Sequence, residues 1–244
     1  MKNLIIQVMI GSPGYAYNKG EVTNLFEKYC MPSVKRYCEK HGYDYKLITE
    51  YPKDHNPRWF NFNTKPDSFD YRQGGKQKAT TLVRYLNMYN ENYDNIISLD
   101  CDIYIPETAQ PLPEIKGHVG IRDLGKSWDS FRKAYPLPQD TFVNGGVQMV
   151  NKKSGKKLYD FMVVVVDNQI KPPMDYKSDQ SYMNYWRSQN SEESFLLGTE
   201  WNYMVGSHIP GYNKKDYKNQ NFIHYAGGVG RSELVNDIKS GIIK

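Results

Sequence analysis

Short apolar runs alternate with segments of helical period along this chain. Apolar runs bounded by polar or turn residues predict buried strands, and these fall at residues 4–10, 43–48, 96–99 and 118–122. A Gly-Gly pair followed by an alternating stretch predicts a turn and a strand within residues 142–151, and a last strand is expected at 222–225.

Apolar stripes at helical spacing lie between these strands. They predict helices at residues 21–41, 77–89, 154–169 and 178–187. Pro32 is expected to interrupt the first helix and Gly42 to end it, and Ser154 can cap the third. Residues 52–75 show no period and predict a long loop.

Strands that alternate with helices favour an α/β fold with a mostly parallel central sheet flanked by helices. No repeat or Gly/Ser linker divides the chain, so we expect a single domain. In such sheets a ligand binds beyond the carboxyl ends of the strands, where strand order reverses. We therefore expect metal-binding and catalytic residues at the ends of strands.

Composition excludes several classes of protein. The chain has 244 residues, of which 39% are hydrophobic and 24% charged, so it is neither disordered nor fibrous. A net charge of +5 suits an anionic ligand such as a phosphate ester, and is low for a nucleic-acid module of this size. The basic clusters at residues 152–157 and 214–218 are either solvated faces or phosphate contacts of a nucleic-acid acceptor.

Cysteine usage and the apolar runs favour a soluble cytoplasmic protein. The 3 cysteines are too few for a disulfide framework and lack metal-site spacing, which is typical of buried thiols in a reducing compartment. No apolar run is long enough to span a membrane, and residues 1–10 lack a signal-peptide cleavage site. The composition would also suit a phage enzyme in its host's cytoplasm.

The strongest chemical signal is Asp100 and Asp102, which follow the apolar strand at residues 96–99. In an extended chain, residues two apart point to the same side, where two carboxylates repel each other unless a cation lies between them. Hard oxygen ligands suit Mg²⁺ or Mn²⁺, and such an ion can hold a diphosphate. The alternative is a solvated Asp-x-Asp turn.

Four segments, in order, resemble the motifs of one family. They are residues 96–105 (IISLDCDIYI), 142–152 (FVNGGVQMVNK), 178–184 (SDQSYMN) and 222–228 (FIHYAGG). The chain is similar to nucleotide-sugar glycosyltransferases of the GT-A type, most of all to family 8, which includes glycogenin and bacterial galactosyltransferases. The resemblance implies a GT-A-like, Rossmann-like domain.

The resemblance also implies site residues. Asp100, Asp102 and His224 would bind the metal, Asp100 also contacting the nucleotide, and imidazole favours Mn²⁺ over Mg²⁺. Taken alone, His224 is more typical of a structural histidine. Further roles fall on residues that would line the donor sugar or act in catalysis: Asn144, Gly145, Gly146, Asp179 and Gln180. Without the resemblance, these would be a tight turn and an acidic helix start.

Contacts to the nucleotide are expected from both ends of the chain. The base would lie against Val8 and Gly11 and stack on Tyr15 or Tyr17. The diphosphate would meet Lys78, with Lys76 and Arg84 as competitors. The last segment, with Gly227, departs from the family's Lys-Pro-Trp ending, and Arg231 is the candidate to replace that lysine.

These patterns predict a metal-dependent glycosyltransferase that moves a sugar from a nucleoside diphosphate donor, UDP first, to an acceptor hydroxyl, and the resemblance implies retention at the anomeric carbon. The nucleotide would bind residues 1–105, and the sugar and the acceptor residues 106–244. The acceptor is a glycan, a protein or hydroxymethylated DNA, the last as in phage DNA glycosyltransferases. A non-catalytic sugar- or nucleic-acid-binding domain remains an alternative. A nucleotidyltransferase and an aspartyl phosphatase fit less well, because a basic Gly-rich loop and an N-terminal Asp-x-Asp are missing.

Overall fold

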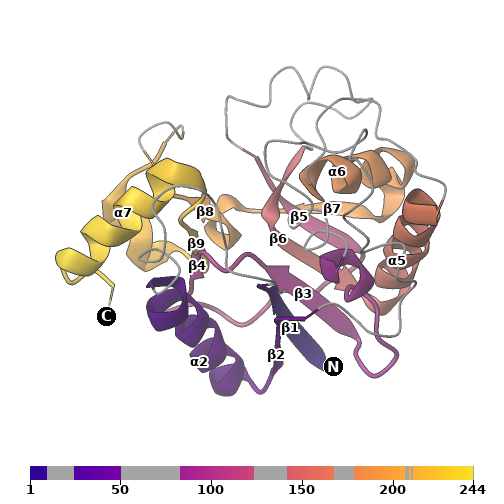
Figure 1. Ribbon diagram of the computed structural model, residues 1–244, viewed down its shortest axis with the longest axis horizontal. Coiled ribbons are helices and arrows are strands. Elements are labelled where there is room, and N and C mark those ends of the chain that lie inside the picture. The colour runs from indigo at the N-terminus through magenta and orange to yellow at the C-terminus, as the bar shows by residue number, and fades with distance from the viewer. Residues whose placement is uncertain are drawn as a thin grey trace.

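A computed structural model shows a central six-stranded sheet (Figure 1), and it describes residues 1–9, 25–50, 83–123, 142–167, 179–206, 209 and 211–243. The strands are β1 (Asn3–Val8), β2 (Asp44–Ile48), β3 (Asn95–Leu99), β5 (His118–Arg122), β6 (Val143–Asn151) and β7 (Ser194–Leu197). Their order is β2-β1-β3-β6-β5-β7, and β6 runs antiparallel to both of its neighbours while the other pairs are parallel. The predicted α/β fold with a mostly parallel sheet is confirmed.

Helices cover both faces of this sheet. On one face, α5 (Lys152–Asp167) and α6 (Asp179–Gln189) pack with residues 83–88 over Leu4 and Ile6 of β1. On the other face, α2 (Met31–His41) packs over Ile5. Adjacent residues of β1 thus enter opposite cores, as the pleat of a strand requires, and this explains why Leu4, Ile5 and Ile6 are all apolar.

A smaller three-stranded sheet lies beside the first. It comprises β4 (Ile103–Tyr104), β9 (Ile223–His224) and β8 (Tyr203–Met204), in that order. It packs with α7 (Gly227–Lys239) and the π-helical turn η1 (Phe26–Cys30) in a third core, and Figure 1 shows α7 at the far end from α5 and α6. Short 3₁₀ turns complete the described elements: η5 (Ser191–Glu193), η6 (Thr199–Trp201) and η7 (Lys214–Asn219).

Local sequence explains where several helices begin and end. Gly42 ends α2 at φ +69°, a left-handed conformation that glycine adopts without strain, and its N–H bonds the carbonyl of Cys38. Pro32 lies in the first turn of α2, where its missing N–H costs little, so it marks a helix start directly after η1. The prediction that Ser154 caps the third helix is wrong: α5 begins earlier, and the side chain of Asn151 accepts the N–H of Ser154 at 2.9 Å.

Three strands and one helix were not predicted: β4, β7, β8 and α7. β4 and β8 have only two residues each, β7 is a half-exposed edge strand, and α7 opens with glycines. The strand expected at residues 222–225 is present as β9, but it belongs to the small sheet. The large sheet takes β1–β3 from the predicted nucleotide half and β5–β7 from the other half, so the two halves share one sheet. Their separate roles stay predictions.

Among the described helices, none has the length and apolarity needed to cross a membrane.

We expect Asp237→Ala to lower the free energy of unfolding by about 2–5 kcal/mol. Asp237 of α7 is fully buried and accepts hydrogen bonds from Tyr217 and Tyr225 at 3.0 Å and from Lys214 at 2.7 Å. Its loss leaves two buried hydroxyls without their acceptor. Urea unfolding measures the effect. Glu233→Ala, which removes the other carboxylate on Lys214, is the control and should cost about 1 kcal/mol or less. Equal losses in both variants would contradict this role of Asp237.

Candidate metal centre

Two carboxylates and one imidazole meet where β3 ends beside β9. Asp100 and Asp102 lie in the turn between β3 and β4, and His224 is on β9, which pairs with β4. One ligand atom from each of the three residues lies within 4.8 Å of the others. The side chains are 40%, 13% and 3% exposed, so the cluster is buried on the His224 side and reaches solvent at Asp100. The structure therefore brings together the three residues predicted to bind metal.

The chemistry of this cluster fits a divalent cation. Oδ1 of Asp102 is buried and receives no well-aligned hydrogen bond from the described residues, although Nε2 of His224 lies 3.2 Å away. A buried carboxylate oxygen is costly unless a positive charge faces it, and either a protonated His224 or a bound cation would supply that charge. Two oxygens and one imidazole nitrogen form a donor set that suits Mn²⁺. Asp100, Asp102 and His224 would hold such an ion.

The pKa of His224 reflects the same concentration of negative charge. Burial lowers this pKa, but the carboxylates of Asp102 and Asp100 raise it by more, so the net pKa lies above the ordinary histidine value. Cys101 lies between the two aspartates, and partial burial together with their charges raises the pKa of its thiol. The thiol of Cys101 points to the carbonyl of Val8, to which its Sγ donates at 3.6 Å.

Asp100 is oriented by a buried arginine. Nη1 of Arg84 donates to Oδ1 of Asp100 at 2.8 Å, and Nε of Arg84 donates to the hydroxyl of Ser98 at 2.5 Å. The side-chain amide of Gln7 on β1 donates to the carbonyl of Asp100 at 3.0 Å, and the N–H of Asp100 bonds the carbonyl of Gly146 at 2.9 Å. Arg84, considered as a diphosphate contact, is 5% exposed and holds Asp100 in place.

His224 is held from behind by amide side chains. Its Nδ1 lies 2.8 Å from Oδ1 of Asn202, and Nδ2 of Asn202 donates to Oδ1 of Asn144 at 3.0 Å. Gly146 of β6 passes directly under the imidazole: a Cβ at this position would lie 2.5 Å from Nδ1 of His224 and closer still to Cε1. Glycine is thus required here because the histidine ring occupies the space of a side chain.

The glycine pair predicted to line the donor sugar already has partners within the protein. The N–H of Gly145 bonds Oε1 of Gln180 at 3.0 Å, and the N–H of Gly146 bonds Oδ1 of Asn144 at 2.7 Å. Gln180, on α6, also donates from Nε2 to Asp123 at 2.5 Å. Asn144 and Gln180 are 7% and 5% exposed, and their side chains hydrogen-bond the backbone of the two glycines. Their roles toward a sugar stay predictions.

Other predicted site residues are placed around the cluster or fall outside the described residues. Val8 is the last residue of β1, at the same carboxyl end of the parallel strands as Asp100. Gly227 opens α7 at φ +65°, and Arg231 is half-buried in the same helix. Asp179 is the first residue of α6, but its side chain lies outside the described part of the structure, as do the remaining predicted contacts: Gly11, Tyr15, Tyr17, Lys76 and Lys78.

Three residues support the site in roles that the sequence did not indicate: Gln7, Asn202 and Asp123. Each is a polar residue at most 3% exposed. A buried polar residue must find hydrogen-bond partners, so a polar residue inside an apolar run is a signal of such a role, and of the three only Gln7 shows it. Gln7 interrupts the first apolar stretch, and it bonds both the Asp100 carbonyl and the hydroxyl of Tyr45.

The basic clusters are paired with local carboxylates. In the first, Lys153 and Lys157 lie 3.1 and 2.6 Å from Glu193, and Lys156 bonds Asp160. In the second, Lys214 bonds Asp237 and Glu233. These pairings favour solvated faces of the protein and give no support to a DNA-binding surface.

Comparisons with known proteins identify the fold. No family model and no curated protein matches the sequence. Among solved structures, galactosyltransferase LgtC in complex with donor and acceptor sugar analogs matches with a TM-score of 0.59 and 14% identity, over 97% of this chain and 95% of that one. The chain has the GT-A glycosyltransferase fold. This confirms the fold that the four sequence segments implied.

Two further matches cover almost the same length. A glycosyltransferase involved in glycosylation of the major capsid of PBCV-1 matches with a TM-score of 0.57 and 12% identity, over 98% of this chain and 100% of that one. Mouse xyloside xylosyltransferase 1, in its apo form, gives a TM-score of 0.53 and 12% identity, over 92% of this chain and 97% of that one. At such low identity these likenesses describe architecture.

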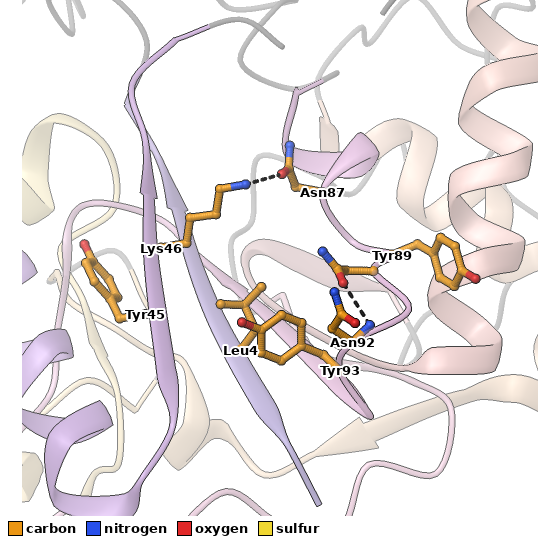
Figure 2. Close-up of a pocket in the computed structure, with 8 residues that line it drawn as sticks. Leu4, Tyr45, Lys46, Asn87, Tyr89, Asn92 and Tyr93 are labelled. Atoms are coloured by element: carbon orange, nitrogen blue, oxygen red, sulfur yellow. Dashed lines mark hydrogen bonds between the residues drawn. The ribbon is translucent and has the colours of Figure 1, made fainter. Parts of the chain in front are cut away.

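A separate hollow of about 350 Å³ lies between β1, β2 and the segment after residue 86 (Figure 2). Figure 2 shows the amine of Lys46 reaching Asn87, at 3.3 Å, above Leu4 and Tyr93. None of the residues of the metal cluster lines this hollow. It is therefore distinct from the candidate metal centre.

Proposed function

We propose that this protein is a metal-dependent glycosyltransferase that moves a sugar from a nucleoside diphosphate donor, UDP first, to an acceptor hydroxyl. The observation that carries the proposal is the convergence of Asp100, Asp102 and His224 beyond the carboxyl end of β3 in a GT-A fold, with the buried Oδ1 of Asp102 3.2 Å from Nε2 of His224. The solved structures of similar fold are described as galactosyl-, xylosyl- and capsid glycosyltransferases.

The chain supplies several groups for such a donor. A divalent cation, Mn²⁺ first, would stabilise the negative charge of the departing diphosphate. Asp100 is exposed enough for a ligand to reach the cluster from solvent. α7 begins three residues after His224, and no side chain caps its N-terminus, so its first N–H groups and the helix dipole favour an anion there. Arg231 adds a positive charge in the same helix.

The chemistry follows from these positions. The acceptor oxygen forms a bond to the anomeric carbon while the bond to the diphosphate oxygen breaks, and the hydroxyl proton passes to the departing phosphate. Among the described side chains none stands out as a covalent nucleophile, and the side chain of Asp179, the candidate beside the sugar, lies outside them. Retention of configuration would then arise from attack on the same face that the leaving group departs from. Residues 1–105 would bind the nucleotide and residues 106–244 the sugar and acceptor, which would be a glycan or a protein.

The proposal predicts that Mn²⁺ and UDP bind cooperatively. We expect calorimetric titration to show UDP binding about 5–150-fold tighter with Mn²⁺ than with chelator, and Mn²⁺ binding tighter by the same factor with UDP, because such coupling is reciprocal. A donor screen that detects released nucleoside diphosphate then identifies the sugar. UDP affinity that is indifferent to metal would contradict the proposal and favour a non-catalytic binding domain.

A further inference from the structure

A continuous chain of buried hydrogen bonds connects His224 of the small sheet to the end of β5 in the large sheet. It runs through Asn202, Asn144 and Gln180 to Asp123 at the end of β5. The side chains of its five members are between 1% and 7% exposed. At such burial each polar atom needs a partner, so the direction in which every bond is donated has consequences.

One backbone group fixes that direction. The N–H of Gly146 donates to the side chain of Asn144 at 2.7 Å, so the atom it meets must be the oxygen of that amide. The Asn202 side-chain atom that lies 3.0 Å from the same oxygen must then be the amide nitrogen. Asn202 therefore turns its own oxygen toward His224.

The orientation of Asn202 determines the protonation of the histidine ring. An amide oxygen accepts hydrogen bonds and cannot donate them, so Nδ1 of His224, at 2.8 Å, carries the hydrogen. In the neutral ring Nε2 then holds a lone pair, and Nε2 is the atom that lies 3.2 Å from Asp102 and 3.7 Å from Asp100. A lone pair beside two carboxylates is repelled unless a proton or a metal cation lies between them.

A second backbone group fixes the other end of the chain in the same sense. The N–H of Gly145 donates to Oε1 of Gln180 at 3.0 Å, which leaves the nitrogen of Gln180 to donate to Asp123 at 2.5 Å. Nδ2 of Asn144 also points to Oε1 of Gln180, at 3.5 Å. Every bond is thus donated in the direction from His224 to Asp123, and reversing any amide would set two donors or two acceptors against each other.

We propose that Asn202 is a positioning residue that holds His224 in the Nδ1–H tautomer, so that Nε2 is presented as a ligand, and that the chain from Asn202 to Asp123 fixes this polarity. This inference rests on the proposed metal-dependent function only for the identity of the ion that Nε2 would bind. Outer partners of this kind fix the ring orientation and tautomer of ligating histidines, and their loss costs about 10- to 100-fold in metal affinity.

The first test needs no metal. In chelator-treated protein labelled with ¹⁵N-histidine, at a pH above the pKa of His224, the ring nitrogen shifts report the tautomer, and the spectrum of His224→Gln assigns the signal among the 5 histidines. We expect wild type to show Nδ1–H with Nε2 unprotonated. In Asn202→Ala we expect the Nε2–H form to gain population, because Nδ1 loses its acceptor while Asp102 can accept from Nε2.

The second test measures Mn²⁺ alone, by calorimetry or electron paramagnetic resonance. Asn202→Ala should bind Mn²⁺ about 10- to 100-fold more weakly than wild type. The matched control is Asn95→Ala, which removes a buried asparagine bonded to Asn3 at 2.8 Å at the opposite end of β3. This control should keep both the tautomer and the Mn²⁺ affinity of wild type.

The outcomes separate this inference from the proposed function. An Nε2–H tautomer in metal-free wild type would overturn the inference, even if Asn202→Ala failed to fold. A wild-type tautomer and affinity in folded Asn202→Ala would overturn it as well. If wild type bound no Mn²⁺, the proposed function would fail, whereas the tautomer in metal-free protein would still decide the role of Asn202.

Discussion

Asp102→Asn is expected to abolish metal-dependent sugar transfer and to leave the fold intact. Asparagine matches aspartate in size but lacks its charge, so the buried position keeps its packing while one of two anionic ligands is lost. The carbonyl of Asp102, which accepts the N–H of Tyr225 at 3.0 Å, is unaffected by the change. Since the loss of outer partners alone costs about 10- to 100-fold, we expect turnover to fall by more than about 100-fold.

The measurement is release of nucleoside diphosphate from the donor, with and without Mn²⁺, supported by thermal unfolding of each variant. Asp160→Asn, which removes the same charge from the exposed surface of α5, is the matched control and should retain wild-type turnover. Wild-type donor turnover in Asp102→Asn would show that the metal assignment is wrong.

The two aspartates could be found from local sequence, and the histidine could not. Asp100 and Asp102 follow a wholly apolar strand, and such a strand has a predictable carboxyl end. His224 lies on a two-residue strand whose neighbours in space are set by the pairing of β9 with β4. No periodicity in the chain encodes that pairing, so only the resemblance of its segment to a family motif indicated the histidine.

The supporting residues were beyond sequence reasoning for a related reason. Asn202, Asp123 and Arg84 act through partners far away in the chain, as in the bond between Asn202 and Asn144. Arg84 looks like any basic residue of a helix, and its burial against Ser98 and Asp100 became visible only in three dimensions. Sequence pattern reports the face on which a residue lies, whereas its hydrogen-bond partner depends on the tertiary fold.

The fold itself was predictable where the hydrophobic period was strong. The strands of the central sheet other than β7 and the helices α2, α5 and α6 follow clear apolar patterns. α7 was missed because its first residues include glycines at positions 227, 228 and 230, which weaken a helix prediction. In the structure α7 is stabilised by tertiary contacts, among them the buried Asp237.

Gly146→Ala is expected to eliminate Mn²⁺ binding and to destabilise the protein. The new Cβ would lie 2.5 Å from Nδ1 of His224 and 2.9 Å from Oδ1 of Asn144, distances at which the ring must move. That movement breaks the bond from Nδ1 to Asn202 and displaces Nε2 from the carboxylates. We expect Mn²⁺ affinity to fall by more than about 100-fold, because ligand and outer partner are lost together. Overpacking should also cost about 1–3 kcal/mol of stability.

The control for this variant must also be overpacked, but away from the metal. Gly120 of β5 meets that condition, since a Cβ there would lie 2.8 Å from Cβ of Val143. Gly120→Ala should therefore lose similar stability in urea unfolding and still bind Mn²⁺ with wild-type affinity in calorimetry. If Gly146→Ala bound Mn²⁺ as well as Gly120→Ala does, the histidine would not be a ligand. If both variants lost binding equally, the effect would be general destabilisation, and the close approach of Gly146 to His224 would have no specific role.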